Sequence, residues 1–190
     1  MKPYKTLSKS ILHQNPWWRY GCDRIEFPSG KQGEYHYVFT NGSSMVVAVD
    51  DNGRLLLVRQ YRYTGNRDSL EFPCGGVKDK STHDLTAREE FLEETGFVPA
   101  FIEAVGEFNP CNGLLDEICR VYIARELHYA GAKPEETESF ELVRLTSGEM
   151  DENISSGIIW DGMTLAAWTI AKNKLFLKPS YLRDTRHPVA

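Results

Sequence analysis

The chain has 190 residues, of which 41% are hydrophobic and 26% are charged, the balance of a soluble globular protein with one ordinary domain and a small addition. Its net charge of −5 argues against a nucleic-acid-binding protein, which usually has a basic face. We find no apolar run near the roughly 20 residues that cross a bilayer, and no secretory signal pattern after Met1. We therefore expect a cytoplasmic protein with neither nucleic acid nor membrane as a partner.

Strands and turns are predicted for the first forty residues. One short strand is expected at 8–14, an aromatic-rich strand at 17–27, and a third at 34–40, where aromatic and β-branched side chains suit a pleated surface. Asn41 and Gly42 then form a turn that ends this region.

A second unit begins with a hairpin, because the apolar segments 45–49 and 55–60 flank an Asp-Asn-Gly turn sequence. Further elements are expected as a helix at 81–95, strands at 104–106, 118–124 and 140–145, and helices at 148–156 and 163–174. Strands and helices do not alternate regularly along the chain. We therefore predict an α+β fold and not a doubly wound parallel sheet.

The four cysteines show no metal-binding or disulfide pattern in the sequence. Cys22, Cys74, Cys111 and Cys119 form no C-x-x-C pair, and no histidine lies near them at ligand spacing. We interpret them as reduced thiols, with a zinc site or a disulfide framework as the alternatives.

The helix expected at 81–95 carries four carboxylates in one arc. At about 100° per residue, Glu89, Glu90, Glu93 and Glu94 lie close together on its surface. Like charges four residues apart each cost about 0.2–0.5 kcal/mol in an isolated helix, so the cluster needs a stabilising partner. A hard divalent cation is such a partner, since Mg²⁺ prefers oxygen ligands and shares them with substrate phosphates. A solvated acidic helix face is the alternative.

The surroundings of the acidic arc favour a ligand-binding cleft. Gly75 and Gly76 precede the helix and allow the backbone to approach a ligand or to bend sharply. Apolar side chains flank the arc on both sides, Leu85 and Phe91 among them. We expect these flanks to hold the helix between two layers, with its acidic arc facing a cleft.

The segment from 75 to 97, GGVKDKSTHDLTAREEFLEETGF, resembles the Nudix box, whose pattern is G-x5-E-x7-R-E-U-x-E-E-x-G-U with U an aliphatic or aromatic residue. The residues that match the pattern without gaps are Gly75, Glu90, Phe91, Glu93, Glu94, Gly96 and Phe97. Ser81 and Glu89 depart from it, because the pattern has Glu at the first position and Arg at the second. In the family that Arg orients the carboxylates, so we expect this site to work differently from the usual box, or more slowly.

The resemblance implies a set of metal ligands. It assigns Glu90 and Glu94 as direct ligands of Mg²⁺, with Mn²⁺ as the alternative ion. Glu93 is a further ligand, or a catalytic residue that orients the ligands. By the same resemblance the backbone carbonyl of Cys74 is also a ligand, and Gly75 lies against the substrate.

The rest of the chain narrows the resemblance to one branch. A strand-rich N-terminal segment, then Arg-Gln-Tyr-Arg at 59–62, then the box is similar to the ADP-ribose pyrophosphatase and nucleotide-sugar hydrolase branch. This implies a Nudix-type α/β/α sandwich with a mixed sheet at 43–178, preceded by a small N-terminal antiparallel β-sheet domain at 1–42. A C-terminal tail follows at 179–190. The branch also implies a homodimer with a small nucleotide as substrate.

Three residues outside the box are implied to contact the substrate. Arg62 reaches a phosphate or the ribose, and Glu117, in the loop 108–117, is a further contact. A surface arginine and an incidental loop acid are the alternatives. Trp18 stacks on the nucleobase from the N-terminal region; packing in the core or a dimer interface is the alternative.

A carboxylate-rich segment at 134–141 resembles the loop that supplies the general base in this branch. Glu136 and Glu138 are the candidates, and Glu136 is preferred. A base must come within hydrogen-bond reach of the attacking water. A disordered acidic linker is the alternative for this segment.

The resemblance implies Mg²⁺-dependent hydrolysis of the diphosphate in ADP-ribose or a related nucleoside diphosphate sugar, which releases a nucleoside monophosphate and a sugar phosphate. The alternative is a degenerate Nudix module that binds nucleotide ligands without cleaving them. Ser81 and Glu89 are the sequence features that support this alternative.

Overall fold

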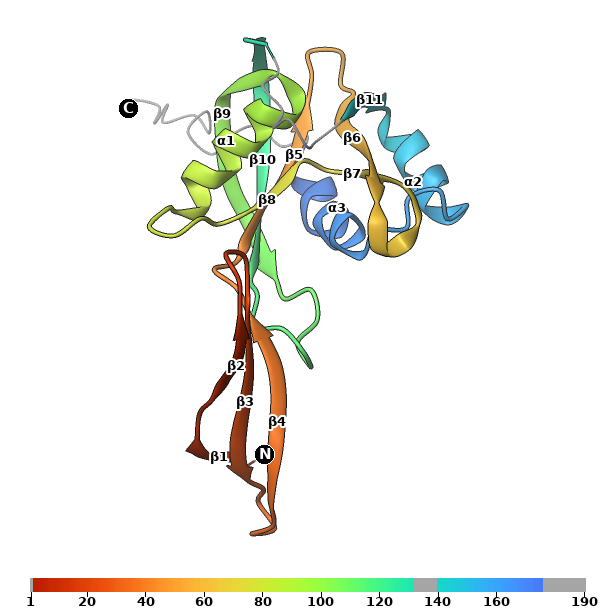
Figure 1. The fold of residues 1–190 in the computed structure, drawn as a ribbon. Coiled ribbons are helices and arrows are strands. Elements are labelled where there is room, and N and C mark those ends of the chain that lie inside the picture. Colours follow the sequence, from red (N-terminus) through yellow and green to blue (C-terminus); the bar gives the residue numbers. More distant parts are fainter. Residues whose placement is uncertain (1, 132–139, 176–190) are drawn as a thin grey trace, which may run out of the picture.

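The chain forms two β-sheets, and α-helices pack around the second of them (Figure 1). This architecture is seen in a computed structural model that describes residues 2–131 and 140–175. The first sheet projects from the helix-covered second sheet (Figure 1). No helix in the described ranges is long and apolar enough to cross a membrane.

The first sheet is antiparallel and is built around one central strand. Its strands are β1 (Lys5–Ser8), β2 (Ile11–Gln14), β3 (Arg19–Glu26) and β4 (Gln32–Phe39). β1 and β2 pair with successive parts of β3, and β4 pairs with its whole length. The prediction of one strand at 8–14 is therefore wrong, because the register shifts along β3 and the chain leaves the ladder between Ser8 and Ile11.

The second sheet is mixed. Its strands are β5 (Ser43–Val49), β6 (Leu55–Arg62), β7 (Arg67–Glu71), β8 (Cys74–Gly76), β9 (Phe97–Phe108), β10 (Cys119–Tyr129) and β11 (Glu141–Leu145). A short 3-10 turn, η1 (Tyr63–Gly65), joins β6 to β7. β5 runs parallel to β10 on one side and antiparallel to β6 and β8 on the other. β9 is much longer than the strand predicted at 104–106, because it pairs with β10 along nearly its full length.

Helices cover both faces of the second sheet. They are α1 (His83–Thr95), α2 (Ser147–Ser155) and α3 (Gly162–Leu175). All seven residues of β5 are buried, and their side chains alternate between two cores. Val46 belongs to the core that contains Phe91 of α1, whereas Met45 belongs to the core that contains Trp168 of α3 and Met150 of α2.

This α/β/α arrangement, with a mixed sheet preceded by a small antiparallel sheet, confirms the predicted fold class. The first sheet ends at Phe39 and the second begins at Ser43. The division of the chain into domains at 1–42 and 43–178 stays a prediction. The predicted tail at 179–190 lies outside the described residues.

Candidate active site

The acidic helix α1 is fastened at both ends. The Thr82 side chain accepts a hydrogen bond from the Leu85 N–H at 3.2 Å and so caps the first turn. At the other end Gly96 adopts a left-handed conformation with φ 79°, and its N–H donates to the Leu92 carbonyl. The helix therefore begins and ends at positions set by its own sequence.

Side chains in the first turn of α1 bind it to the sheet. His83 Nδ1 lies 3.0 Å from the Ser43 carbonyl oxygen, and the Ser44 hydroxyl donates to the His83 carbonyl at 2.9 Å. The Tyr122 hydroxyl of β10 donates to the carboxylate of Asp84. Burial and this carboxylate raise the pKa of Tyr122. These contacts hold the carboxylates of α1 at a defined height above β5 and β10.

The four carboxylates of α1 differ in burial from one side of the arc to the other. Glu94 is only 9% exposed, Glu90 and Glu93 are half-buried, and Glu89 is exposed. Glu94 is adjacent on the helix surface to the fully buried Phe91, which faces the sheet. The residue that replaces the family's Arg therefore lies farthest from the interior.

Among the described residues, the two flanks of the acidic arc differ in burial. Ala87 and Phe91 are fully buried, but Leu85 is 48% exposed. Leu92, on the same flank as Leu85, is half-buried, so the described residues do not confirm that apolar flanks hold the helix between two layers. The polar contacts of the first turn attach the helix further to the sheet.

Gly75 of β8 lies directly against the carboxylate of Glu90. A Cβ added to Gly75 would fall 2.1 Å from Glu90 Cδ and 2.3 Å from Oε2, far inside van der Waals contact. The next residue, Gly76, has no atom within 4 Å of its added Cβ. The close approach is thus specific to one glycine, which allows the main chain of β8 to lie beside a partly buried carboxylate.

The backbone of Cys74 faces away from the strand that pairs with β8. The Val46 N–H donates to the Pro73 carbonyl, and the Val77 N–H donates to the Gly42 carbonyl, both at 2.9 Å. In an antiparallel ladder bonded and non-bonded pairs alternate, so Cys74 and its partner Met45 form a non-bonded pair. The Cys74 carbonyl oxygen therefore points away from β5.

The Cys74 thiol is close to carboxylates of both α1 and the connection between β9 and β10. Interaction with Cys119, burial, and the carboxylates of Glu94 and Glu117 all raise the pKa of Cys74. Glu117 is held by the Ser43 hydroxyl, which donates to its Oε1 at 2.5 Å. The fold thus brings Glu94 and Glu117 to the same thiol, although 23 positions separate them in the sequence.

Arg62 is held by a buried acid that the sequence reasoning missed. Its Nε donates to Glu71 Oε1 at 2.8 Å, a second bond joins its terminal nitrogen to Oε2, and Glu71 is 2% exposed. These hydrogen bonds raise the pKa of Arg62. The Gln60 amide also donates to Glu71 at 3.4 Å. The β6–β7 hairpin creates the pair, and only its Gly-Asn turn at 65–66 signals it in the sequence.

Trp18 lies at the junction of the two sheets. It lines a surface pocket together with Arg19, Phe39 and Asp79, and Asp79 belongs to the loop before α1. The Asn41 amide donates to Asp79 Oδ1 at 2.9 Å. The aromatic end of the first sheet therefore lies beside the loop that leads into the acidic helix.

The two candidates for the general base, Glu136 and Glu138, lie outside the described residues.

The donors in this region are of the kind that a hard divalent cation prefers, although the carboxylate oxygens of Glu90, Glu93 and Glu94 do not gather within 4.8 Å of one another in the described residues. Three carboxylates of one helix and the Cys74 carbonyl, which faces away from β5, are oxygen donors, the ligands that such ions prefer. Lys78 Nζ lies 4.0 Å from Glu90 Oε1, so a basic side chain is also near the carboxylates. Oxygen donors for a metal, together with the positively charged Lys78 side chain, suit a substrate that carries phosphate groups and binds with a metal ion.

The arrangement agrees with the known proteins that are similar to this chain. The family model of the NUDIX domain matches residues 25–156. The chain belongs to the Nudix family. An ADP-ribose pyrophosphatase of Bacillus subtilis (strain 168) is 28% identical over 165 residues, which are 86% of this chain and 89% of that protein. An ADP-ribose pyrophosphatase of Mycobacterium tuberculosis (strain ATCC 25618 / H37Rv) is 33% identical over 134 residues, 70% of this chain and 64% of the relative.

A solved structure supports the Nudix fold independently of the close sequence relatives. The crystal structure of an ADP compounds hydrolase matches with a TM-score of 0.81 at 18% identity, over 91% of this chain and 94% of that one. The predictions of the Nudix family, its ADP-ribose pyrophosphatase branch and the pyrophosphohydrolase class are confirmed. Nudix hydrolases generally use divalent metal ions, in keeping with the carboxylates of α1.

Proposed function

We propose that this Nudix chain hydrolyses the diphosphate of ADP-ribose or a related nucleoside diphosphate sugar in a Mg²⁺-dependent reaction, releasing a nucleoside monophosphate and a sugar phosphate. The observation that carries the proposal is the close contact between Gly75 of β8 and the carboxylate of Glu90. Glu90 is on the same helix, α1, as Glu93 and Glu94. The names of the relatives from Bacillus subtilis and Mycobacterium tuberculosis support ADP-ribose as the first substrate to test.

Glu90 and Glu94 are the proposed direct ligands of Mg²⁺, with the Cys74 carbonyl as a third. Glu93 is a further ligand or orients the other carboxylates. Mg²⁺ bound there supplies charge neutralisation for the diphosphate and lowers the pKa of a coordinated water. The protein contributes fixed positions for these donors, and the partial burial of Glu94 limits the water that competes for them.

Arg62 is proposed to bind a substrate phosphate or the ribose. Glu71 holds its guanidinium through two bonds, and its side chain remains 45% exposed, so part of it is accessible from solvent. Glu117, held by Ser43, is proposed as a substrate contact beside Glu94. Gly75 is proposed to let the diphosphate approach the main chain of β8.

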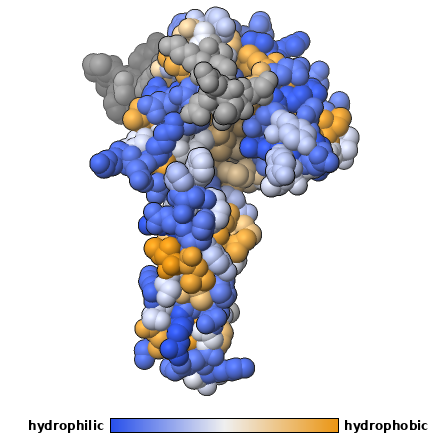
Figure 2. Space-filling model, viewed as in Figure 1, coloured by the Kyte–Doolittle hydropathy of each residue, from blue (hydrophilic) through white to orange (hydrophobic). Residues whose placement is uncertain are grey.

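Trp18 is proposed to stack on the nucleobase in the pocket at the junction of the sheets. A homodimer is proposed to form through the first sheet. Figure 2 shows hydrophobic side chains on the surface of this sheet; Leu7, Ile11 and Leu12 of its strands are exposed, as is Trp17 in the β2–β3 connection. Exposed apolar residues gathered on one small sheet are typical of an interaction surface.

Glu136 is proposed as the general base, with Glu138 as the second candidate. Both lie outside the described residues, so their assignment depends on the likeness of the segment 134–141 to the loop of this branch. Separate Glu136→Gln and Glu138→Gln variants test it. The variant of the true base is expected to lose kcat while KM changes little, because a base acts on the water and not on substrate binding.

The function is tested by incubating the purified chain with Mg²⁺ and a panel of ADP-ribose, GDP-mannose and diadenosine polyphosphates, followed by chromatography of the products. Release of AMP and ribose 5-phosphate from ADP-ribose is the expected result. No turnover across the panel, together with thermal stabilisation by one of these ligands, would replace the hydrolase with a module that only binds nucleotides. The same assay with Mn²⁺ in place of Mg²⁺ decides which ion supports the faster reaction.

A further inference from the structure

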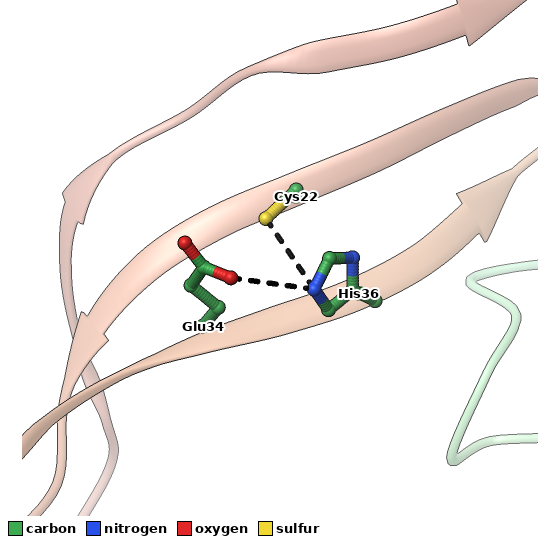
Figure 3. A group of neighbouring side chains, drawn as sticks. All are labelled: Cys22, Glu34 and His36. Atoms are coloured by element: carbon green, nitrogen blue, oxygen red, sulfur yellow. Dashed lines mark hydrogen bonds and ion pairs between the residues drawn. The ribbon is translucent and has the colours of Figure 1, made fainter.

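Three side chains of the first sheet gather their donor atoms in one small volume. They are Cys22 of β3 and Glu34 and His36 of β4, and their ligand atoms all lie within 4.8 Å of one another. His36 Nε2 is 3.6 Å from Glu34 Oε2 and 3.7 Å from Cys22 Sγ (Figure 3). The strands that carry the cluster, β3 and β4, belong to the projecting sheet, apart from α1 (Figure 1).

Strand register sets this cluster. β3 and β4 pair without a shift along eight residues, and Cys22 lies directly opposite His36. Glu34 is two residues before His36 on the same strand, so both side chains are on one face of the sheet. Arg24, opposite Glu34, donates to Gln32 at 3.1 Å, which leaves the Glu34 carboxylate directed at His36.

Tyr20 orients the His36 ring so that its Nε2 atom can bind a metal ion. Its hydroxyl oxygen lies 2.9 Å from His36 Nδ1, and the two rings stack with centroids 5.8 Å apart. When Nδ1–H donates to this oxygen, the proton is kept off Nε2, and the lone pair of Nε2 points between the sulfur and the carboxylate. A metal-binding histidine is usually oriented by such a bond from its other nitrogen.

We propose that Cys22, Glu34 and His36 form a second metal site, which binds Zn²⁺ and is separate from the diphosphate site. A thiolate, an imidazole and a carboxylate are the ligands of zinc, whereas Mg²⁺ selects oxygen. With zinc bonds of about 2.0–2.3 Å, tetrahedral geometry requires donor separations of about 3.4–3.6 Å. The separations of 3.6 and 3.7 Å at His36 Nε2 match this requirement with little movement.

The site has three protein ligands and an open fourth position. The side chains of Glu34 and His36 are 63% and 45% exposed, so water completes the coordination. Zinc binds the thiolate form of cysteine, so the Cys22 thiol proton is released to solvent as the sulfur–metal bond forms. The bound ion joins β3 to β4 near the middle of the sheet.

The site is tested by titrating the chain with Co²⁺, which reports a cysteine ligand by a thiolate-to-metal charge-transfer absorption band. Excess Mg²⁺ is present, so that the oxygen ligands of α1 are occupied. We expect one Co²⁺ per chain with this band, and its displacement by Zn²⁺. Tyr20→Phe is expected to weaken binding by about 10-fold, because it removes only the bond that orients His36.

Matched variants separate this site from other metal binding. Cys22→Ser and His36→Gln are expected to abolish the band, whereas Cys111→Ser, at an exposed thiol outside the cluster, retains it. Glu93→Gln, in the diphosphate site, is also expected to retain it. Absence of the band in the unaltered chain, or a band that survives Cys22→Ser, would overturn the proposal and leave only a cross-strand pair of His36 and Glu34.

A measurement on the unaltered chain does not depend on any variant folding. Alkylation by iodoacetamide, followed by peptide mass mapping, gives the rate at each thiol. Saturating Zn²⁺ is expected to slow alkylation of Cys22 by about tenfold or more, since a coordinated sulfur is a poor nucleophile, and to leave exposed Cys111 unchanged. Equal rates at Cys22 with and without Zn²⁺ would contradict zinc binding there.

Discussion

Gly75 lies so close to Glu90 that residue 75 has no room for a side chain: its Cβ would fall 2.1 Å from Glu90 Cδ. The glycine at the start of the Nudix box therefore has a steric role that depends on a carboxylate 15 positions later. Because β8 is paired with β5, it shifts to relieve a clash less easily than an unpaired loop does.

Gly75→Ala is expected to raise the Mg²⁺ concentration that half-saturates hydrolysis by about 10–100-fold, because the added methyl group displaces the Glu90 carboxylate. The measurement is the rate of ADP-ribose hydrolysis as a function of Mg²⁺ concentration. Gly76→Ala is the matched control, since its added Cβ meets nothing within 4 Å, and it is expected to behave like the parent chain. Equal losses in both variants would show that the contact with Glu90 is not the cause.

The gradient of burial along α1 predicts unequal effects of two neutral substitutions. Glu94→Gln removes the most buried carboxylate of α1 and is expected to lower kcat by about 100-fold or more, the scale of a single group that stabilises charge in the transition state. Glu89→Gln changes an exposed residue and is expected to keep the rate within about threefold. A large loss from Glu89→Gln would mean that Glu89 turns into the site when substrate binds.

Glu89→Gln is also expected to stabilise the fold slightly. It removes a like-charge pair with Glu93 four residues away, which costs about 0.2–0.5 kcal/mol in a helix. The free energy of unfolding in urea, compared with that of the parent chain without metal, measures this gain. The gain should disappear at high salt, which screens exposed charges. Destabilisation by Glu89→Gln at low salt would contradict this explanation.

Two arginines of β6 are paired with glutamates of very different burial. Arg62 is bound to Glu71, whose side chain is 3% exposed, while Arg59 Nε lies 3.2 Å from Glu141, whose side chain is 68% exposed. Arg62→Ala leaves a buried carboxylate without its main partner and is expected to cost about 1–3 kcal/mol of stability. Arg59→Ala is expected to cost below about 1 kcal/mol, as for most surface pairs.

Chemical unfolding of both arginine variants provides the comparison. Arg62→Ala together with Glu71→Gln is expected to recover part of the loss, because the neutral amide is less costly to bury than the charge. Similar costs for Arg59→Ala and Arg62→Ala would contradict the importance of the burial of Glu71.

The first turn of α2 predicts a pH-dependent contribution to stability. The Thr146 N–H donates to Glu149 Oε2 at 2.7 Å, and this bond lowers the pKa of Glu149. A carboxyl group whose pKa is lower in the folded chain stabilises the fold above its unfolded pKa of about 4.3, and this contribution is lost as the pH falls through the folded value.

Urea unfolding of the parent chain and of Glu149→Gln, from about pH 7 down to about pH 3, tests this contribution. We expect the difference in unfolding free energy to be largest at neutral pH and to shrink below about pH 4. Thr146→Ser, which keeps a capping hydroxyl, is the control and should follow the parent curve. A difference that grows toward acidic pH would have the wrong sign for this bond.

The sequence alone determined the features that depend on local spacing. The periodicity of 81–95 predicted an acidic helix, and the structure places α1 at His83–Thr95. The hairpin between β5 and β6 followed from its turn residues. The match to the Nudix box then identified the family. Such features are local because hydrogen bonds within a turn or a helix join residues only a few positions apart.

Only the tertiary structure decided which residues meet across the sheets. Cys22 and His36 showed no ligand spacing in the sequence, yet the register of β3 and β4 places them opposite each other. The pairing of Glu71 with Arg62 is made by the β6–β7 hairpin, of which the sequence shows only the Gly-Asn turn. A shift of one residue in either ladder would turn these side chains to opposite faces, and register depends on the packing of the whole sheet, not on any short segment.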